Sequence, residues 1–152
     1  MREYMTHWHN PQSLNFVRLG VSVCNQAEAN ERIPLLLQTP AAFRWVSIEP
    51  MVEEVNLSPW SVGWTGQNSK LPSPLREALE RLPDINHLDW IVVGAESGPA
   101  RRPCPWAWVK NIVQECRDAG VPCYVKQMDG DHSVIYPGND REWPDWAVQE
   151  QP

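Results

Sequence analysis

Short apolar runs bounded by turn-forming residues recur four times along the chain. The clearest is Trp90–Val93, which ends in Gly94 and is typical of a buried strand of a parallel sheet. The sequence of such a strand is a continuous apolar run, because both faces of a parallel sheet are covered. The four predicted strands are Phe16–Val23, Phe43–Ile48, Trp90–Val93 and Cys123–Val125.

Apolar residues at helical spacing follow the first run. Ala29, Ile33, Leu36 and Leu37 fall on one face and predict a helix from Gln26 to about Gln38. Just before it, Asn25 is a candidate N-cap, with Glu28 three residues further on, as in a capping box. Pro34 lies inside this segment and is expected to kink or restart the helix.

The strongest helical pattern covers Pro105–Ala119. Its apolar stripe is followed by Gly120, a typical residue just beyond a helix, and soon by Pro122. A shorter helix is predicted over Pro74–Leu82, inside the long connection at 55–86.

The alternation of strand and helix predicts an α/β domain of four successive βα units with parallel strands. Two of the three strand-to-strand intervals match a βα unit of roughly 30 residues, and the third contains the long connection. A closed eight-stranded barrel needs about 200 residues, so the chain is either an open sheet or half a barrel. Residues 1–14 are predicted to be an irregular lead-in, 15–127 the βα domain, and 128–152 an irregular tail.

Composition narrows the classes of protein. The 152 residues carry a net charge of −6, which argues against a protein that binds nucleic acid through overall charge, although a local basic patch remains open. No apolar run approaches the roughly 18 residues of a membrane helix and the chain starts with polar residues, so the expected compartment is the cytoplasm. The four cysteines lack paired spacing and are expected to be free thiols.

Polar residues stand where the predicted strands end. Since the carboxyl ends of parallel strands meet at one edge of the sheet, these residues are candidates for a ligand-binding mouth. Two carboxylates there can bind a cationic group or act as acid and base, while a lysine can neutralise a carboxylate or phosphate. The predicted ligand-binding residues are Ser22, Glu49, Glu96, Ser97, Lys126 and Gln127.

Structural roles compete with each of these assignments. Either carboxylate can cap the following helix or pair with Arg44, Arg101 or Arg102, and Lys126 can form an ion pair with Glu96 without any ligand. Arg101 and Arg102 are candidates for phosphate binding, but a solvated loop is the preferred interpretation. Catalytic residues are not assigned.

Other motifs carry little weight. His7 and His9 lie in the irregular lead-in without a third ligand nearby, so no metal site is predicted. Gly94 and Gly98 do not form a dinucleotide-binding fingerprint, and neither a nucleophile elbow nor a Walker motif occurs. The nine tryptophans are explained more simply by packing in a core or interface than by base stacking.

Several short motifs, taken together and in order, resemble the C-terminal half of a family of phage proteins named for gene products thirty-seven and sixty-eight. That family is a radical-SAM-like domain of unassigned function. The resemblance covers roughly residues 15–127. The motifs are Leu19–Val23, Glu31–Leu37, Ile48–Pro50, Val93–Pro99, Arg102–Pro103 and Val125–Gln127.

The resemblance implies the C-terminal part of a phage or prophage radical-SAM-like protein that contributes ligand contacts at the C-terminal mouth of a barrel. It implies SAM and a [4Fe-4S] cluster for a full-length assembly, with the cluster held by cysteines of an N-terminal half. This chain has no such cysteine spacing, so no cofactor is expected in it alone and an enzymatic role is left open.

An alternative of another class is a non-catalytic remnant or interaction module. Two open edges of a parallel sheet would pair with the N-terminal half or with a second copy. The substrate, the reaction and the partner are not specified by the sequence.

Overall fold

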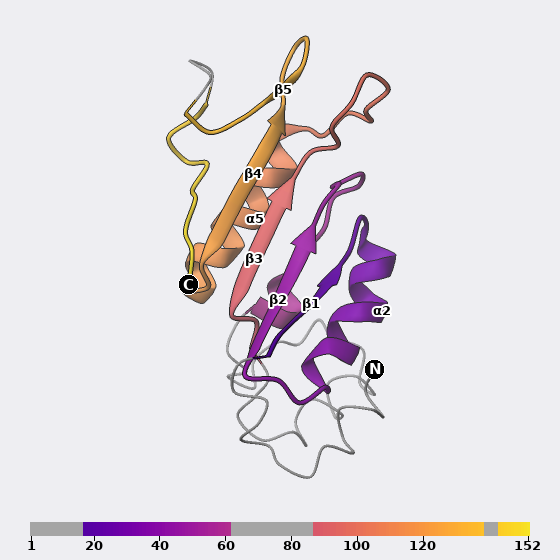
Figure 1. Cartoon of the computed structure of the whole chain (residues 1–152), viewed down its shortest axis with the longest axis vertical. Helices are drawn as coiled ribbons and strands as arrows, with labels where there is room; N and C mark the ends of the chain where they lie inside the picture. The colour runs from indigo at the N-terminus through magenta and orange to yellow at the C-terminus, as the bar shows by residue number, and fades with distance from the viewer. Residues whose placement is uncertain (1–16, 62–86, 139–142) are drawn as a thin grey trace.

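The computed structural model describes residues 17–61, 87–138 and 143–152. Strands and helices alternate along most of the chain (Figure 1). The elements are β1 (Arg18–Ser22), α2 (Gln26–Leu37), β2 (Phe43–Ile48), α3 (Ser58–Ser61), β3 (Trp90–Gly94), α5 (Trp106–Ala119), β4 (Cys123–Asp129) and β5 (Val134–Ile135). The expected α/β class is therefore confirmed.

The strands form one five-stranded sheet in the order β1-β2-β3-β4-β5. The first four are parallel, and each pairs with its neighbour in sequence. Only β5 is antiparallel, against the end of β4. Because the four parallel strands run the same way, their carboxyl ends lie at the same end of the sheet (Figure 1). We call this end the carboxyl edge, as distinct from the outer edges formed by β1 and β4.

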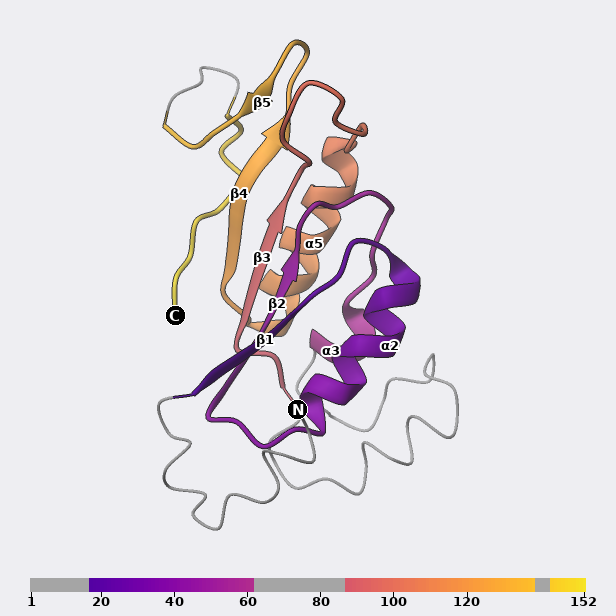
Figure 2. The ribbon, with the colours of Figure 1, turned by 45° about the vertical axis from the view of Figure 1, so that its right-hand side comes forward.

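Both long helices lie on the same face of the sheet (Figure 2). Alternate residues of β2 point into this layer, where Val46 and Ile48 are fully buried. The buried stripe of α5 includes Ile112 and Val113, as its spacing predicted. Gly120 ends this helix with φ of 68°, a left-handed conformation that favours glycine.

The start of α2 follows its sequence signals with one difference. The Asn25 side chain accepts a hydrogen bond from the Glu28 amide (2.9 Å), as an N-cap should. In a capping box the Glu28 carboxylate would return to the Asn25 amide, but here Oε2 accepts from the Cys24 amide instead (2.7 Å). The predicted restart at Pro34 does not occur, since one helix runs through to Leu37 with Pro34 buried.

Replacing Asn25 with alanine is expected to lower the free energy of unfolding by about 1 kcal/mol, because the Glu28 amide loses its acceptor. Chemical denaturation followed by circular dichroism measures this. Asn30→Ala is the matched control: its side chain is exposed and accepts a hydrogen bond from the Gln26 side chain of the same helix, so no loss is expected. Equal losses in both variants would contradict the capping role.

A row of aromatic rings crosses the face of the sheet opposite the helices. Trp45 and Trp90 are partners in the pairing of β2 with β3, and their ring centroids lie 5.7 Å apart. Tyr124 of β4 meets Trp90 edge-on at 6.4 Å. At the other end of the row, Gly20 pairs with Trp45, and a Cβ at position 20 would collide with the indole ring. The glycine therefore makes room for the aromatic row.

Buried Arg44 points into the helix-covered side of β2. Its Nε and Nη2 donate to the Thr39 carbonyl, just beyond the C-terminal end of α2 (3.2 and 3.0 Å). The last turn of α2 contains no basic residue of its own, so this guanidinium supplies the cation that a helix C-terminus favours. Burial lowers the pKa of Arg44.

The segment after β4 is more regular than the sequence predicts. The predicted strand stops at Val125, but β4 continues to Asp129 and then pairs with β5. Further along, Gln149 forms an antiparallel bridge with Tyr124, and the Glu150 amide donates to the Cys123 carbonyl (2.9 Å). The C-terminal segment thus runs along the outer edge of β4, whereas the outer edge of β1 has no partner strand among the described residues.

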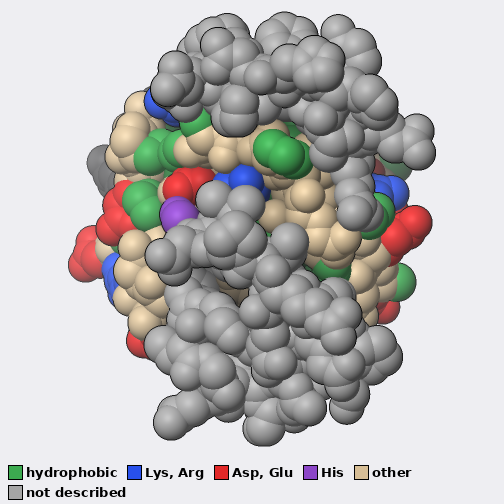
Figure 3. Space-filling model, turned by 90° about the horizontal axis from the view of Figure 1, so that it is seen from below, with side chains coloured by type: hydrophobic (Ala, Val, Ile, Leu, Met, Phe, Trp, Pro, Cys, Tyr) green, Lys and Arg blue, Asp and Glu red, His purple; other side chains and the backbone are tan. Residues whose placement is uncertain are grey.

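Several expectations fall outside the described residues, namely the lead-in at 1–14, the helix over Pro74–Leu82, and His7 and His9. Within the described residues, no helix is long and apolar enough to cross a membrane. Seen from the end at which the strands begin, the visible described surface carries acidic and basic side chains close to one another rather than a broad patch of one sign (Figure 3).

Candidate functional site

The carboxyl edge of the sheet brings together side chains from neighbouring strands. Glu49 directly follows β2, and its Oε1 accepts hydrogen bonds from Lys126 Nζ (2.7 Å) and Gln127 Nε2 (2.9 Å) of β4. The Gln127 amide also donates to the carbonyl of Ala95, directly after β3 (2.7 Å). Three successive strands are therefore joined in one cluster, which we call the Glu49 cluster (Glu49, Lys126 and Gln127).

An irregularity in strand pairing explains how two consecutive residues of β4 reach the same carboxylate. Val93 pairs with Val125, but Gly94 pairs with Gln127, so one residue of β4 is skipped. In a regular strand, Lys126 and Gln127 would point to opposite faces. A bulge of this kind re-aims side chains and is common next to binding sites.

Burial differs within the Glu49 cluster. Gln127 is 3% exposed, whereas the side chain of Lys126 is 52% exposed and that of Glu49 is 20% exposed. The buried Gln127 amide fixes the carboxylate of Glu49, and about half of the lysine side chain is exposed to solvent. The cluster therefore presents one cation and one partly covered anion at the mouth, a pair suited to a ligand with both charges.

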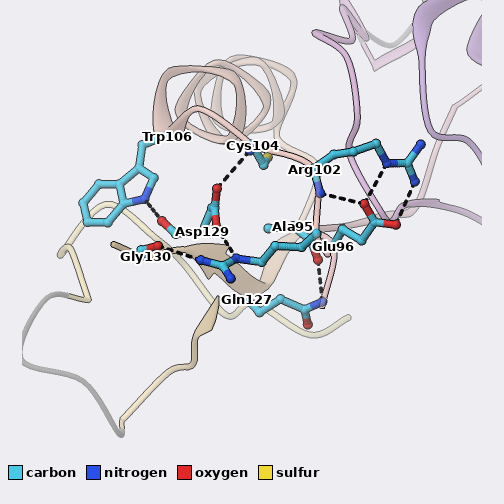
Figure 4. A network of polar contacts seen from close by, with 9 residues as sticks. Ala95, Glu96, Arg102, Cys104, Trp106, Gln127, Asp129 and Gly130 are labelled. Atoms are coloured by element: carbon cyan, nitrogen blue, oxygen red, sulfur yellow. Dashed lines mark hydrogen bonds and ion pairs between the residues drawn. The ribbon is translucent and has the colours of Figure 1, made fainter. Parts of the chain in front are cut away.

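Glu96 belongs to a second ion pair at this edge. Arg102 Nε and Nη2 donate to its two carboxylate oxygens (2.7 and 2.8 Å), and the Arg102 amide donates to Oε2 (2.9 Å) (Figure 4). Pairing with Arg102 was the structural alternative to a ligand-binding role for Glu96. The expected alternative pair of Lys126 with Glu96 is not found, because Lys126 pairs with Glu49.

Hydrogen bonds from Arg102 lower the pKa of Glu96 to about 2. The pair is therefore expected to be intact above the ordinary pKa of the carboxyl and to be lost only as the pH falls towards about 2. Carbon-detected NMR titration of the carboxyl measures the midpoint. In Arg102→Gln the pKa should rise towards the ordinary value of 4.5. An unchanged midpoint in that variant would contradict the assigned cause.

The other predicted residues do not join the Glu49 cluster. Ser97 is exposed in the loop after β3. Ser22 is exposed at the end of β1, and its backbone carbonyl accepts from Arg32 Nη1 (2.7 Å). For both serines, the position near the mouth is therefore the one observation that supports a ligand-binding role.

A second network holds the loop after β3 against β4, and sequence reasoning missed it. Arg101 Nε donates to Asp129 Oδ1 (2.6 Å), and the Cys104 amide donates to Oδ2 (3.2 Å) (Figure 4). Trp106 Nε1 donates to the Asp129 backbone carbonyl (2.5 Å). The only sequence signal was Arg101 itself, since Asp129 lies in the segment predicted to be an irregular tail.

The cysteines offer neither a metal site nor an activated thiol in the part of the chain that the structure describes. All four are free, and Cys104, Cys116 and Cys123 are buried. No group of three potential metal ligands is found there. Burial raises the pKa of Cys24, and it raises that of Cys104 to about 11. A thiolate, the reactive form, is therefore disfavoured at both positions.

The family follows from comparison with known families. The model of a family described as a protein of unknown function, DUF5131, matches residues 1–141. The chain belongs to this family. Comparison with curated proteins and with solved structures found no match. For this DUF5131 chain, the description of the family supplies no reaction, so function rests on the geometry of the carboxyl edge.

Proposed function

We propose that this chain is the C-terminal part of a phage or prophage radical-SAM-like protein and contributes ligand contacts at the mouth of a half-barrel. The observation that carries the proposal is the Glu49 cluster. It unites residues that follow β2 and β3 with residues of β4 at the edge where α/β proteins bind ligands.

The arrangement of the sheet supports the half-barrel. In a barrel, parallel strands follow one another in sequence order and all helices lie outside; a doubly wound sheet has helices on both faces. Here β1 to β4 follow sequence order, and both long helices lie on one face (Figure 2). Since β5 and the C-terminal segment occupy the edge of β4, further strands would join beside β1.

The Glu49 cluster suits a zwitterionic ligand, such as the amino-acid part of SAM. Lys126 would bind the ligand carboxylate, and Glu49 would bind its ammonium group, with Gln127 fixing the orientation of Glu49. The ligand has to replace the contact between Lys126 and Glu49. Because the lysine is half exposed, that contact contributes only about 0–1 kcal/mol, so exchanging it for ligand groups costs little.

The proposed [4Fe-4S] cluster does not fit the described residues of this chain, where no three potential ligands meet. The cluster would therefore be held by a separate N-terminal half. The part assigned to this chain is limited to binding and orienting the ligand.

The test uses the chain produced together with the segment encoded upstream of it, if that segment carries a spaced cysteine cluster. Equilibrium binding of SAM is measured for the assembly and its variants. Lys126→Ala and Glu49→Gln are expected to weaken binding about tenfold or more, and Glu96→Gln to weaken it less, because Arg102 already occupies that carboxylate. Lys110→Ala is the matched control, since this lysine is exposed on α5.

Two outcomes would contradict the proposal. One is SAM binding that is unchanged in both Lys126→Ala and Glu49→Gln. The other is the absence of any encoded segment with a spaced cysteine cluster near this chain, in which case SAM chemistry would be abandoned for it.

A non-catalytic interaction module is the second candidate. The observation that favours it is the outer edge of β1, which has no partner strand in the described part of the chain. Such an edge pairs readily with another chain. Sedimentation equilibrium of the isolated chain tests this idea, and a dimer is expected. A chain that stays monomeric at about 100 μM would count against it, because a dissociation constant above that concentration is weak for a specific dimer.

A further inference from the structure

A separate cavity of about 330 Å³ lies between the loop after β3 and the hairpin that joins β4 to β5. Both segments belong to the carboxyl edge of the sheet, at the top of Figure 1. The polar side chains that line the cavity are Ser97, Arg101, His132, Ser133 and Tyr136. None of the residues of the Glu49 cluster lines it.

The lining is rich in hydrogen-bond donors and contains no carboxylate. It offers a guanidinium, an imidazole and three hydroxyl groups. Arg101 is held in place by Asp129 at Nε (2.6 Å) and by the Gly130 carbonyl at Nη2 (3.0 Å). Among the described residues, no hydrogen bond to its remaining nitrogen, Nη1, is found. A fixed guanidinium with a nitrogen to spare is a suitable contact for an anion.

Gly98 contributes a second feature of this cavity. Its φ of 108° is a conformation that other residues rarely adopt, and nothing lies within 4 Å of the point where a Cβ would stand. A ligand can therefore approach the backbone of this loop closely.

We propose that this cavity binds the phosphoryl group of a small phosphorylated molecule. A phosphoryl group has three oxygens that accept hydrogen bonds from several directions, which matches donors supplied by two different loops. The cavity is larger than a phosphate ion requires, so it has room for part of the esterified molecule beside Tyr136. In the proposed half-barrel these loops would follow the last two strands, which is a frequent location of phosphate sites in α/β barrels.

The expected affinity is modest. Asp129 neutralises much of the charge of Arg101, so binding relies on the number and geometry of donors more than on net charge. For inorganic phosphate alone we expect a dissociation constant on the order of 1 mM. This site shares no residue with the Glu49 cluster, although Ser97, a predicted ligand-binding residue of the mouth, lines it.

The test is an amide NMR titration of the full chain with sodium phosphate at constant ionic strength. Saturable shifts are expected in the segments 97–101 and 132–136. Arg101→Gln should raise the dissociation constant about tenfold, whereas Arg117→Gln, an exposed arginine at the end of α5, should leave it unchanged. The double variant Ser133→Ala, Tyr136→Phe keeps the contact of Arg101 with Asp129 intact and should weaken binding about threefold.

Parallel titrations identify the form of the ligand. Tighter binding of phenyl phosphate than of inorganic phosphate would support an ester, and the reverse would support the free ion as ligand. Equal shifts with sodium acetate would overturn the phosphoryl assignment. Unchanged affinity in both Arg101→Gln and the double variant, or shifts spread over the whole surface, would overturn the site.

Discussion

Replacing Gly20 with valine is expected to lower the free energy of unfolding by about 2–3 kcal/mol. A Cβ at position 20 would overlap the indole of Trp45, and the ring cannot move aside freely because Trp90 packs against it. Overpacking of this size typically costs 1–3 kcal/mol. Urea denaturation followed by tryptophan fluorescence measures the effect and also reports the changed environment of the rings.

Two further variants make this prediction specific. Ser22→Val introduces the same side chain into the same strand at an exposed position and should cost less than about 0.5 kcal/mol. In the background Trp45→Ala, the substitution Gly20→Val should lose most of its cost, because the clashing ring is absent. A full cost in that background would show that Gly20 is required for another reason.

Replacing Asp129 with alanine is expected to cost about 3 kcal/mol and to loosen the loop after β3. The side chain accepts hydrogen bonds from Arg101 and from the Cys104 amide, and both donors are partly buried. Hydrogen bonds to charged groups contribute about 1.5–3 kcal/mol, and the donors left behind lose their acceptor. Thermal unfolding measures the loss, and hydrogen exchange at residues 101–104 measures the loosening.

Asp118→Ala is the matched control for this substitution. Asp118 is exposed and accepts a hydrogen bond from the exposed Gln114 side chain of the same helix, so its removal should change stability by less than about 0.5 kcal/mol. If Asp129→Ala left both stability and exchange at wild-type values, the network of Figure 4 would have no structural importance.

The regular part of the fold could be predicted from hydrophobic spacing. The second strand matches Phe43–Ile48, and α2 and α5 end within one residue of their expected limits. These elements could be predicted because buried positions recur with a strict period. The helix cap at Asn25 and the helix end at Gly120 could be predicted because each depends on residues close by in the sequence.

The end of β4 was missed for a physical reason. Gln127 is polar but buried, and the skipped residue in the pairing with β3 breaks the alternation of faces. A pattern of period two cannot be followed through such a bulge. The strand β5 has two residues, and the bridge at Gln149 has one, so neither provides a periodic signal.

The position of the site residues could be predicted, but their partners could not. Glu49, Glu96 and Lys126 were found because each stands where a strand was expected to end. Which cation meets which carboxylate depends on the lateral order and register of the strands. Because of the bulge in β4, Lys126 forms an ion pair with Glu49, whereas Glu96 forms one with Arg102 of its own loop.

The C-terminal segment beside β4 sets a limit on how this protein can polymerise. A sheet with two free edges can add copies head to tail without end, as fibres do. Here the hydrogen bonds of Val148 and Glu150 to β4 occupy one of the two edges. Among the described residues only the edge of β1 then remains for strand addition, and growth from that edge alone would end after one neighbour instead of continuing into a fibre.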